Sequence, residues 1–277
     1  MPLSTCAVLI DTQQSGTYIV SPGASGSAIS PTVFETTDGG ASWHSLAPPA
    51  GYIAVPDGKA TTLVAGHLIT ELTPTSGSDY WLGELTPTGT WRHVDTTLPF
   101  HILSNSSPAV TQLPASFSVD PEDPAHIYAA MPTGPQGVSL FVTRDAGTSW
   151  KQLYHWPTST LVTVWTAPGN RVYVQDLTDN GVADQFFYSA DGGTTWTGAG
   201  LHEQGADQIF IGPDGRVITL SHNEIFSLAS ATGVFTRLAA APTFSQIPMC
   251  AMSSGAQAVL VCGDLLNTYA MPLPATP

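Results

Sequence analysis

Short stretches in which apolar and polar residues alternate run along the whole 277-residue chain. A period of two is typical of half-buried β-strands, and no segment has the 3.6-residue period of an amphipathic helix. Strand-like segments include "YIAV", "TTLVAG", "SLFVT", "RVYVQD", "QFFYS", "QIFIG" and "AVLVCG". Between them, "VPDGKA" (55–60), "GPDGRV" (212–217) and "VDPEDPAHIYAA" place Pro, Asp and Gly where tight hairpins need them. The sequence predicts an all-β protein.

One octapeptide occurs three times: "TTDGGASW" at 36–43, "TRDAGTSW" at 143–150 and "SADGGTTW" at 189–196. Degenerate copies, "LTPTGTW" and "ASATGVF", end at Trp91 and Phe235, where the Asp is lost but the Gly and the aromatic residue remain. The closing aromatic residues are 48, 59, 46 and 39 residues apart along the chain. A period of roughly 40 to 50 residues suits the four short strands of one propeller blade.

Each repeat has the same order of elements. The third strand ends in the octapeptide, and a short fourth strand follows the aromatic residue. We expect first strands near Cys6, Tyr52, Phe117, Val162, Ile209 and Met249. These repeats predict a single β-propeller domain, residues 1–277, of six four-stranded blades; a seventh blade would need strands that we cannot identify. The last repeat has three strands, so the N-terminal "MPLST" could supply the fourth and close the ring without an open edge.

The octapeptide resembles the Asp-box (BNR) repeat of sialidase-like propellers, a hairpin between the third and fourth strands of a blade. Its Asp can accept backbone N–H bonds, its fifth-position Gly can take a positive φ, and its Trp can pack over the neighbouring blade. The resemblance implies a structural role, on the side away from the functional face, for Asp38, Gly40, Trp43, Asp145, Gly147, Trp150, Asp191, Gly193 and Trp196.

The sialidases that the chain resembles use three arginines to hold a substrate carboxylate. This chain has five arginines; Arg144 and Arg216 occupy turns, and Arg92 and Arg237 follow closing aromatic residues, so we expect these four to be solvated. The Arg-Ile-Pro motif of that family is absent, as are the Gly-x-Ser-x-Gly and His-Glu-x-x-His motifs and any metal-spaced cysteine pair. We therefore predict no catalytic residue, and sialidase activity is disfavoured.

The net charge of −14, with only seven Lys and Arg residues, disfavours nucleic acid and anionic membranes as partners. The sequence contains no run that approaches about 18 apolar residues, the length of a membrane-spanning helix, so we predict no membrane insertion. We see no signal peptide, and expect an excised or mature domain whose Thr/Ser/Gly-rich surface suits an extracellular or cell-surface location. Cys250 and Cys262 flank a predicted hairpin and are either small buried residues or partners across two strands, and Cys6 stays unpaired in both cases.

The long loops are "SPGASGSAIS", "GHLITELTPTSGSDYW", "VDTTLPFHILSNSSPAVTQLPA", "MPTGPQGVS" and "QDLTDNGVADQ". In a propeller such loops emerge on one face, where function usually lies. An aromatic platform for a sugar is one hypothesis for Asp79, Tyr80 and Trp81, near His67 and Glu71 in the same loop; packing between blades is the alternative. Links between blades could bring histidines to the channel mouth as acid–base or metal-binding groups, although scattered loop histidines commonly have no such role. The candidate ligand-binding residues are His67, Asp79, Tyr80, Trp81, His101, His155, Trp156, His202 and Glu203.

Oxygen-bearing side chains are dense in "DLTDNGVAD", which contains Asp176, Asp179, Asn180 and Asp184. Such a density suits Ca²⁺, but the spacing does not match the Asp-x-Asp-x-Asp-Gly loop. A polar turn built on Asn-Gly is the alternative. No cofactor is required, and Ca²⁺ is the one possible ion.

These features predict a non-catalytic extracytoplasmic recognition domain that binds a glycan, peptide or protein through its loop face. The alternative is a glycoside hydrolase or lyase of sialidase-like fold with an unrecognised carboxylate, Tyr or His site. A weaker alternative is an assembly factor for a membrane complex. Such a factor could dock through a basic patch, and the low Lys and Arg content argues against that version.

Overall fold

The structure is a computed structural model. It describes residues 6–11, 13–22, 33–54, 61–76, 80–95, 97–98, 116–133, 137–159, 161–177, 184–202, 208–212, 215–221, 224–228, 235–240, 249–252, 259–263 and 268–273. The chain divides into two compact units, Met1–Pro157 and Thr158–Pro277. The expectation of a single domain over residues 1–277 stays a prediction.

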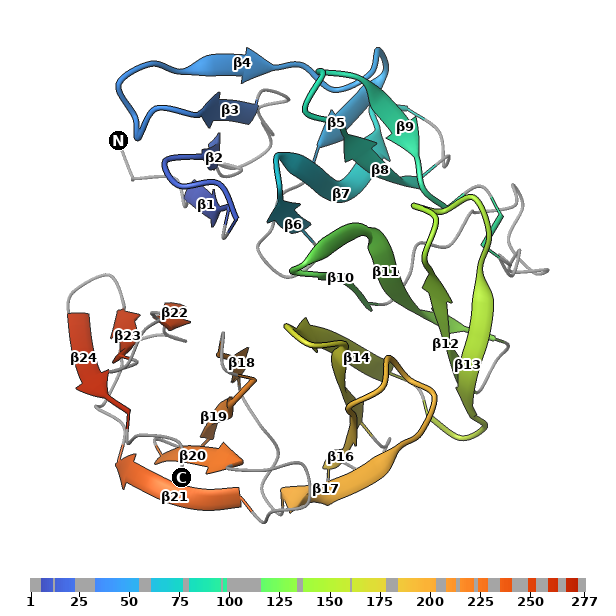
Figure 1. Cartoon of the computed structure of the whole chain (residues 1–277), viewed down its shortest axis with the longest axis vertical. Helices are drawn as coiled ribbons and strands as arrows, with labels where there is room; N and C mark the ends of the chain where they lie inside the picture. The colour runs from blue at the N-terminus through green and yellow to red at the C-terminus, as the bar shows by residue number, and fades with distance from the viewer. Residues whose placement is uncertain are drawn as a thin grey trace. The chain divides into compact units, whose positions relative to one another are not determined.

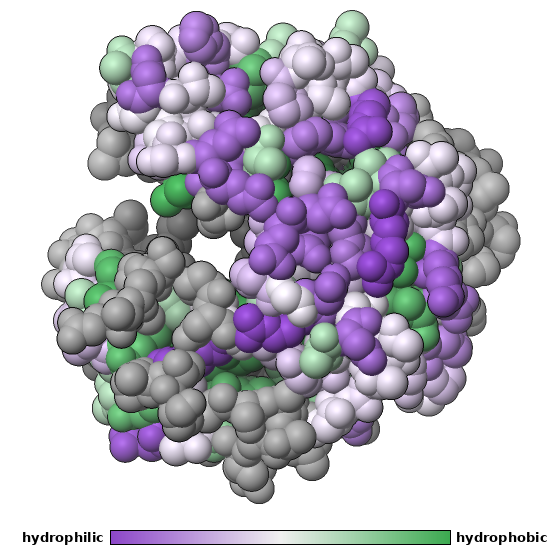
Figure 2. Space-filling view, in the orientation of Figure 1, coloured by the Kyte–Doolittle hydropathy of each residue, from purple (hydrophilic) through white to green (hydrophobic). Residues whose placement is uncertain are grey.

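Every regular element in the described part of the chain is a β-strand, and these strands form antiparallel sheets (Figure 1). The all-β prediction is confirmed. No helix that could cross a membrane occurs among the described residues. On the face seen in Figure 2, hydrophilic residues cover much of the first unit.

The first unit contains three sheets, numbered here in chain order. Sheet 1 consists of β1 (Cys6–Ile10), β2 (Tyr18–Pro22), β3 (Val33–Thr36) and β4 (His44–Leu46). Sheet 2 consists of β5 (Tyr52–Ala54), β6 (Thr61–Val64), β7 (His67–Pro74), β8 (Trp81–Leu85) and β9 (Trp91–His93). Sheet 3 consists of β10 (Ser116–Asp120), β11 (Asp123–Pro132), β12 (Val138–Thr143) and β13 (Lys151–Trp156).

The second unit also contains three sheets. Sheet 4 consists of β14 (Leu161–Ala167), β15 (Arg171–Leu177), β16 (Asp184–Ser189) and β17 (Thr197–His202). Sheet 5 consists of β18 (Gln208–Ile211), β19 (Val217–Ser221), β20 (Glu224–Leu228) and β21 (Phe235–Ala240). Sheet 6 has three described strands, β22 (Met249–Met252), β23 (Val259–Gly263) and β24 (Thr268–Pro272). Each of the six residues expected to mark a first strand lies in the strand that opens one of these sheets. Blade number and ring closure stay predictions.

Two sequence-based expectations are wrong in sheet 2. The segment expected to be the loop "GHLITELTPTSGSDYW" contains the strand β7, because its apolar residues are needed on both faces: Leu68 and Ile69 are at most 1% exposed. The β6–β7 turn is made by Ala65 and Gly66, whose φ angles of 52° and 77° are both positive. The "VPDGKA" segment does not join a hairpin, because β5 and β6 each pair with β7 rather than with each other.

The middle sheet of each unit buries both of its faces. In the first unit, Ile69 and Leu82 of sheet 2 pack with sheet 3, and Leu68 and Leu72 pack with sheet 1. In the second unit, the two faces of sheet 5 pack in the same way against sheets 4 and 6. A strand that is buried on both faces is mostly apolar and does not alternate, so any charged residue within it must find a partner.

Cys262 lies in sheet 6, is 5% exposed and is disulfide-bonded. Its direct register partner on the neighbouring strand is Cys250. For Cys262, the interpretation as a small buried thiol is therefore wrong.

The three octapeptide turns connect the third and fourth strands of sheets 1, 3 and 4. In the turn after β12, the Thr143 hydroxyl donates to Asp145 Oδ1 (2.7 Å) and accepts the Gly147 N–H (2.9 Å). Ser149 donates its N–H to Asp145 Oδ1 (2.8 Å) and its hydroxyl to Oδ2 (2.6 Å). The turns of Asp38 and Asp191 contain the same set of hydrogen bonds, all between 2.6 and 2.9 Å. The carboxylate thus fixes the path from the third strand to the fourth.

The fifth-position glycines have positive φ values of 96° (Gly40), 87° (Gly147) and 85° (Gly193). A Cβ on Gly147 would lie 2.0 Å from the Val94 carbonyl oxygen, so this position needs glycine for space as well as for conformation.

Each octapeptide turn is also tied to the first turn of its own sheet. The residue after the Asp donates its N–H to a carbonyl oxygen in or just after the turn between the first and second strands: Gly39 to Gly16 (2.9 Å), Ala146 to Ala125 at the start of β11 (3.0 Å) and Gly192 to Asn170 (2.9 Å). The two turns at one end of each sheet are therefore held together.

The closing Trp side chains join neighbouring sheets of the first unit. Trp91 Nε1 donates to the Ala47 carbonyl oxygen (3.0 Å), and Trp150 Nε1 donates to that of Val94 (3.1 Å). Both acceptors directly follow the last strand of the preceding sheet. Trp91 belongs to a degenerate copy, so this inter-sheet bond survives where the Asp is lost.

Trp150→Phe is expected to destabilise the protein by about 1 kcal/mol from the lost hydrogen bond, with a smaller addition for the lost ring area. Chemical denaturation measures this loss. Trp43→Phe is the matched control, because the Trp43 side chain is 45% exposed. Equal effects of the two substitutions would contradict the role of the Trp150 bond.

The hydrogen bonds of the octapeptide turns predict an acid transition. The Ser149 hydroxyl bond, followed by its N–H bond, lowers the pKa of Asp145 to about 2, and the Thr195 bonds do the same for Asp191. A carboxyl with a lowered folded-state pKa stabilises the protein above its unfolded pKa of about 4, and this stability is lost as the pH falls through about 2. Asp145→Asn should therefore lower the melting temperature at pH 7 and lose this effect near pH 2. Asp123→Asn is the control, since Asp123 is exposed and accepts a single hydrogen bond among the described residues, from the Ala125 N–H. A loss of melting temperature in Asp145→Asn that does not change with pH would contradict this account.

Candidate functional site

Trp81 does not form an open aromatic platform, which is one of the two interpretations drawn from the sequence. It opens β8, is 6% exposed, and belongs to the core shared by sheets 1 and 2. Its ring stacks on His93, with centroids 3.4 Å apart, and meets the Tyr52 ring edge to face at 5.0 Å. Packing therefore describes Trp81 better than sugar stacking. Tyr80 is partly buried, and Asp79 and His101 lie outside the described residues.

The expected inter-blade link "YHWPTST" begins inside a strand, because β13 extends to Trp156. Trp156 is 5% exposed and packs against Tyr154, with centroids 4.6 Å apart. His155 is exposed, and its Nδ1 lies 3.0 Å from Ser139 Oγ. His202 is the last residue of β17, and Glu203 lies outside the described residues.

The residues expected to bind Ca²⁺ are only partly described. Asp176 lies in β15 rather than in a loop, is 5% exposed, and accepts a 2.5 Å hydrogen bond from the Ser159 hydroxyl. Asp184 opens β16, whereas Asp179 and Asn180 lie outside the described residues. Within the described ranges, no group of three or more His, Cys, Asp or Glu residues could hold a metal ion. Ca²⁺ binding stays a prediction.

The arginines differ from the expectation of solvated side chains at one position. Arg144 is exposed, Arg171 is partly buried, and the side chains of Arg92 and Arg237 are 45% and 52% exposed. Arg216 is only 6% exposed, so the expectation of a solvated turn residue is wrong there. Arg216 directly precedes β19, whose first four residues, Val217, Ile218, Thr219 and Leu220, are also buried.

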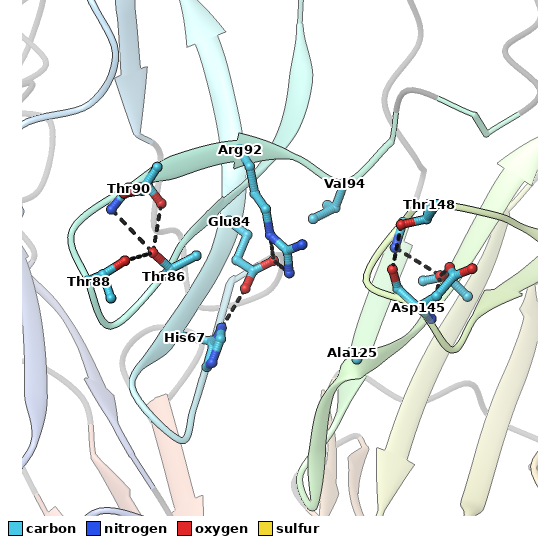
Figure 3. Close-up of polar contacts among 12 residues, drawn as sticks. His67, Glu84, Thr86, Thr88, Thr90, Arg92, Val94, Ala125, Asp145 and Thr148 are labelled. Carbon is cyan, nitrogen blue, oxygen red and sulfur yellow. Dashed lines mark hydrogen bonds and ion pairs between the residues drawn. The ribbon is translucent and has the colours of Figure 1, made fainter.

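A polar cluster in sheet 2 consists of His67, Glu84 and Arg92 and is named here the Glu84 cluster (Figure 3). Glu84 lies in β8, between β7 and β9, and its register partners are Ile69 and Arg92. His67 precedes Ile69 by two residues, so all three side chains leave the same face of the sheet.

Glu84 is fully buried, and each of its oxygens has a partner. Oε1 lies 2.5 Å from His67 Nδ1, while Oε2 lies 2.6 Å from Arg92 Nε and 2.5 Å from Arg92 Nη2. Burial of a carboxylate without partners would cost several kcal/mol, and these contacts offset that cost. The side chains of Arg92 and His67 nevertheless remain 45% and 26% exposed. The cluster therefore holds two nitrogen-bearing side chains at the surface from a buried anchor.

A second polar group lies at the other end of β8. Asp95 is 2% exposed, accepts the Leu82 N–H at Oδ2 (2.6 Å), and has Oδ1 3.6 Å from His93 Nδ1. Burial raises the pKa of Asp95, and the Leu82 bond and His93 only partly oppose this shift. A carboxyl that holds its proton to higher pH can act as a proton donor.

Sequence reasoning missed Glu84 and Asp95 as candidates. The signal for Glu84 was a single charge inside the apolar strand "WLGEL", and the signal for Asp95 was the His-x-Asp spacing in "RHVD". Neither pattern indicates which residue of a neighbouring strand contacts the carboxylate.

Comparisons with known proteins place the fold but not the family. No protein-family model matches the sequence, and no curated protein matches it significantly. Among solved structures, the chain is similar to an ancestral GH74 enzyme, with a TM-score of 0.58 and 13% identity over 95% of this chain. The chain spans only 36% of that enzyme's length.

Two further solved structures are similar over most of the chain. One comes from a nidogen/laminin complex, with a TM-score of 0.52, 12% identity, and coverage of 96% of this chain and 93% of that one. The other is YCF48 bound to D1 peptide, with a TM-score of 0.50, 12% identity, and coverage of 89% and 71%. Together with the all-β architecture, these similarities support a β-propeller-type fold.

The raised pKa of Asp95 predicts a stability change with pH. A carboxyl whose folded-state pKa is raised contributes stability below its unfolded pKa of about 4, and this contribution is lost as the pH rises through the folded-state value. Asp95→Asn keeps an acceptor for the Leu82 N–H and removes the buried charge. Thermal melts should show the variant gaining stability relative to the wild type as the pH rises from 4 to 8. A constant difference over that range would contradict the assignment.

Proposed function

We propose that the protein is a non-catalytic recognition domain that binds a peptide or protein partner. The observation that carries this proposal is the Glu84 cluster, in which a fully buried carboxylate holds a half-exposed arginine. Protein interfaces are enriched in arginine, and an ordered arginine loses little freedom on binding.

The carboxylates of the octapeptide turns are poor candidates for catalysis. Hydrogen bonds lower the pKa of Asp38, Asp145 and Asp191, so these groups carry no proton near neutral pH. Both oxygens of Glu84 are likewise engaged by partners. These observations favour binding over acid–base chemistry at these positions.

A peptide or protein ligand is favoured over a glycan because the Trp proposed to stack on a sugar is buried. Two of the fold neighbours come from a nidogen/laminin complex and a YCF48–D1 peptide complex, which agrees with this choice. The loop face expected to bind the ligand falls largely outside the described residues. The Glu84 cluster lies instead at the end of sheet 2 that carries the β6–β7 and β8–β9 turns, and we propose that the partner binds there.

We also propose that the six sheets are blades of one Asp-box propeller, closed between the N- and C-terminal strands. The repeated turn geometry and the six matching first strands support this arrangement. An extracytoplasmic location is proposed as well, and the disulfide of Cys262 supports it because disulfides persist in oxidising compartments.

Asp95 favours a second candidate function, a glycoside hydrolase. Its raised pKa suits a general acid, and a GH74 enzyme is among the fold neighbours. A glycosidase of the usual kind needs a second carboxylate across a cleft, and among the described residues Asp95 has only the His93 contact as an ionisable partner.

Panning the protein against a random peptide library, alongside a glycan array and glycosidase assays, separates these functions. The proposal predicts enriched peptides that bind with micromolar affinity and are recovered uncleaved. Hydrolysis of a glycoside that Asp95→Asn abolishes would overturn the proposal and establish the enzyme. Glycan binding without peptide binding would overturn the choice of ligand.

A further inference from the structure

We propose that Arg92, with His67 beside it, binds a single carboxylate of the partner, either a free peptide C-terminus or one acidic side chain. This inference rests on the proposed function, because it names the chemistry that the recognition surface reads.

The guanidinium of Arg92 is used on one edge only. Glu84 Oε2 contacts Nε and Nη2, which together form the side-on edge of the group (Figure 3). The end-on edge, between Nη1 and Nη2, has no other contact among the described residues. A guanidinium can take a carboxylate on each of two edges, with two parallel N–H···O bonds on a free edge. Arg92 can therefore join the buried Glu84 to a carboxylate that arrives from solvent.

His67 contacts the other oxygen of Glu84, and we expect it to give the bound carboxylate a second contact beside Arg92. Its Nδ1 faces Oε1, which leaves Nε2 on the far side of the ring. The backbone that carries His67 is also held in place, because Asp11 accepts the N–H groups of Ala65 (3.2 Å) and Gly66 (2.6 Å) in the turn that precedes His67. The two surface groups are thus held by Glu84 and by a braced turn.

A matched pair elsewhere in the chain lacks this anchor. Arg237 Nε lies 2.7 Å from Glu224 Oε1, but the side chains are 52% and 37% exposed. An exposed ion pair of this kind is weak and loses order readily. The difference between Arg92 and Arg237 is therefore the burial of the glutamate, which makes Arg237 the natural control.

The overall charge limits the ligand to one or few negative groups. A net charge of −14 repels polyanions at long range, whereas a single carboxylate can be bound by short-range hydrogen bonds. A short peptide end fits this limit better than an acidic segment.

Nitrogen NMR of the arginine Nε–H groups tests the proposal with sodium acetate as the probe and acetamide as the neutral control. The chain has five arginines, so Arg92→Lys and Arg237→Lys assign the two relevant signals. At constant ionic strength, acetate should shift the Arg92 signal along a saturating curve, while acetamide should shift it at least about tenfold less. The Arg237 signal should change linearly.

If the Arg92 and Arg237 signals shift alike with acetate concentration, or if acetate and acetamide shift the Arg92 signal equally, the proposal of a carboxylate site is overturned. In Arg92→Lys, the His67 ring signals should no longer respond to acetate, because a lysine cannot present the end-on edge; an unchanged response would also overturn it. Failure of this test leaves peptide binding by the panning experiment intact. Failure of the panning with a positive acetate result would instead remove the proposed function.

Discussion

The aspartate carboxylate that follows a third strand is the interaction on which the repeated architecture depends. In sheets 1, 3 and 4 it binds the N–H and hydroxyl of the same downstream residue and the hydroxyl at the strand end. The turn so fixed is tied to the first hairpin of its sheet, and in sheet 3 the last residue of the octapeptide, Trp150, reaches the preceding sheet. One carboxylate thereby positions a turn, a fourth strand and an inter-sheet contact.

Sheet 2 departs from this scheme, and its distinctive chemistry lies in the same sheet. Its turn has no Asp; the Thr86 hydroxyl lies 2.9 Å from that of Thr88 and accepts the Thr90 N–H at 3.2 Å. Trp91 still donates its indole N–H to the preceding sheet. Glu84, two residues before Thr86, lies inside the apolar strand β8 and contacts His67 and Arg92 through its carboxylate. The charged group in this repeat thus sits within the sheet instead of in the turn.

The strand pattern and the repeat were readable from the sequence because both depend on local residue order. Period-two alternation placed the first strand of every sheet, and the octapeptide placed three turns. The pattern failed over residues 67–74, since a strand buried on both faces does not alternate and its Thr and Glu residues looked like loop. The burial of Trp81 and the pairing of Glu84 depend on cross-sheet register, which no local pattern contains.

The central functional claim is that buried Glu84 keeps Arg92 ordered at the surface before any partner arrives. The {1H}–15N heteronuclear NOE of the arginine Nε–H groups in the free protein measures this order directly. The account predicts a value for Arg92 close to that of the rigid backbone and a much lower value for Arg237, whose glutamate is exposed. Equally low values for both arginines would contradict the account, because Arg92 would then be no better prepared for binding than an ordinary surface side chain.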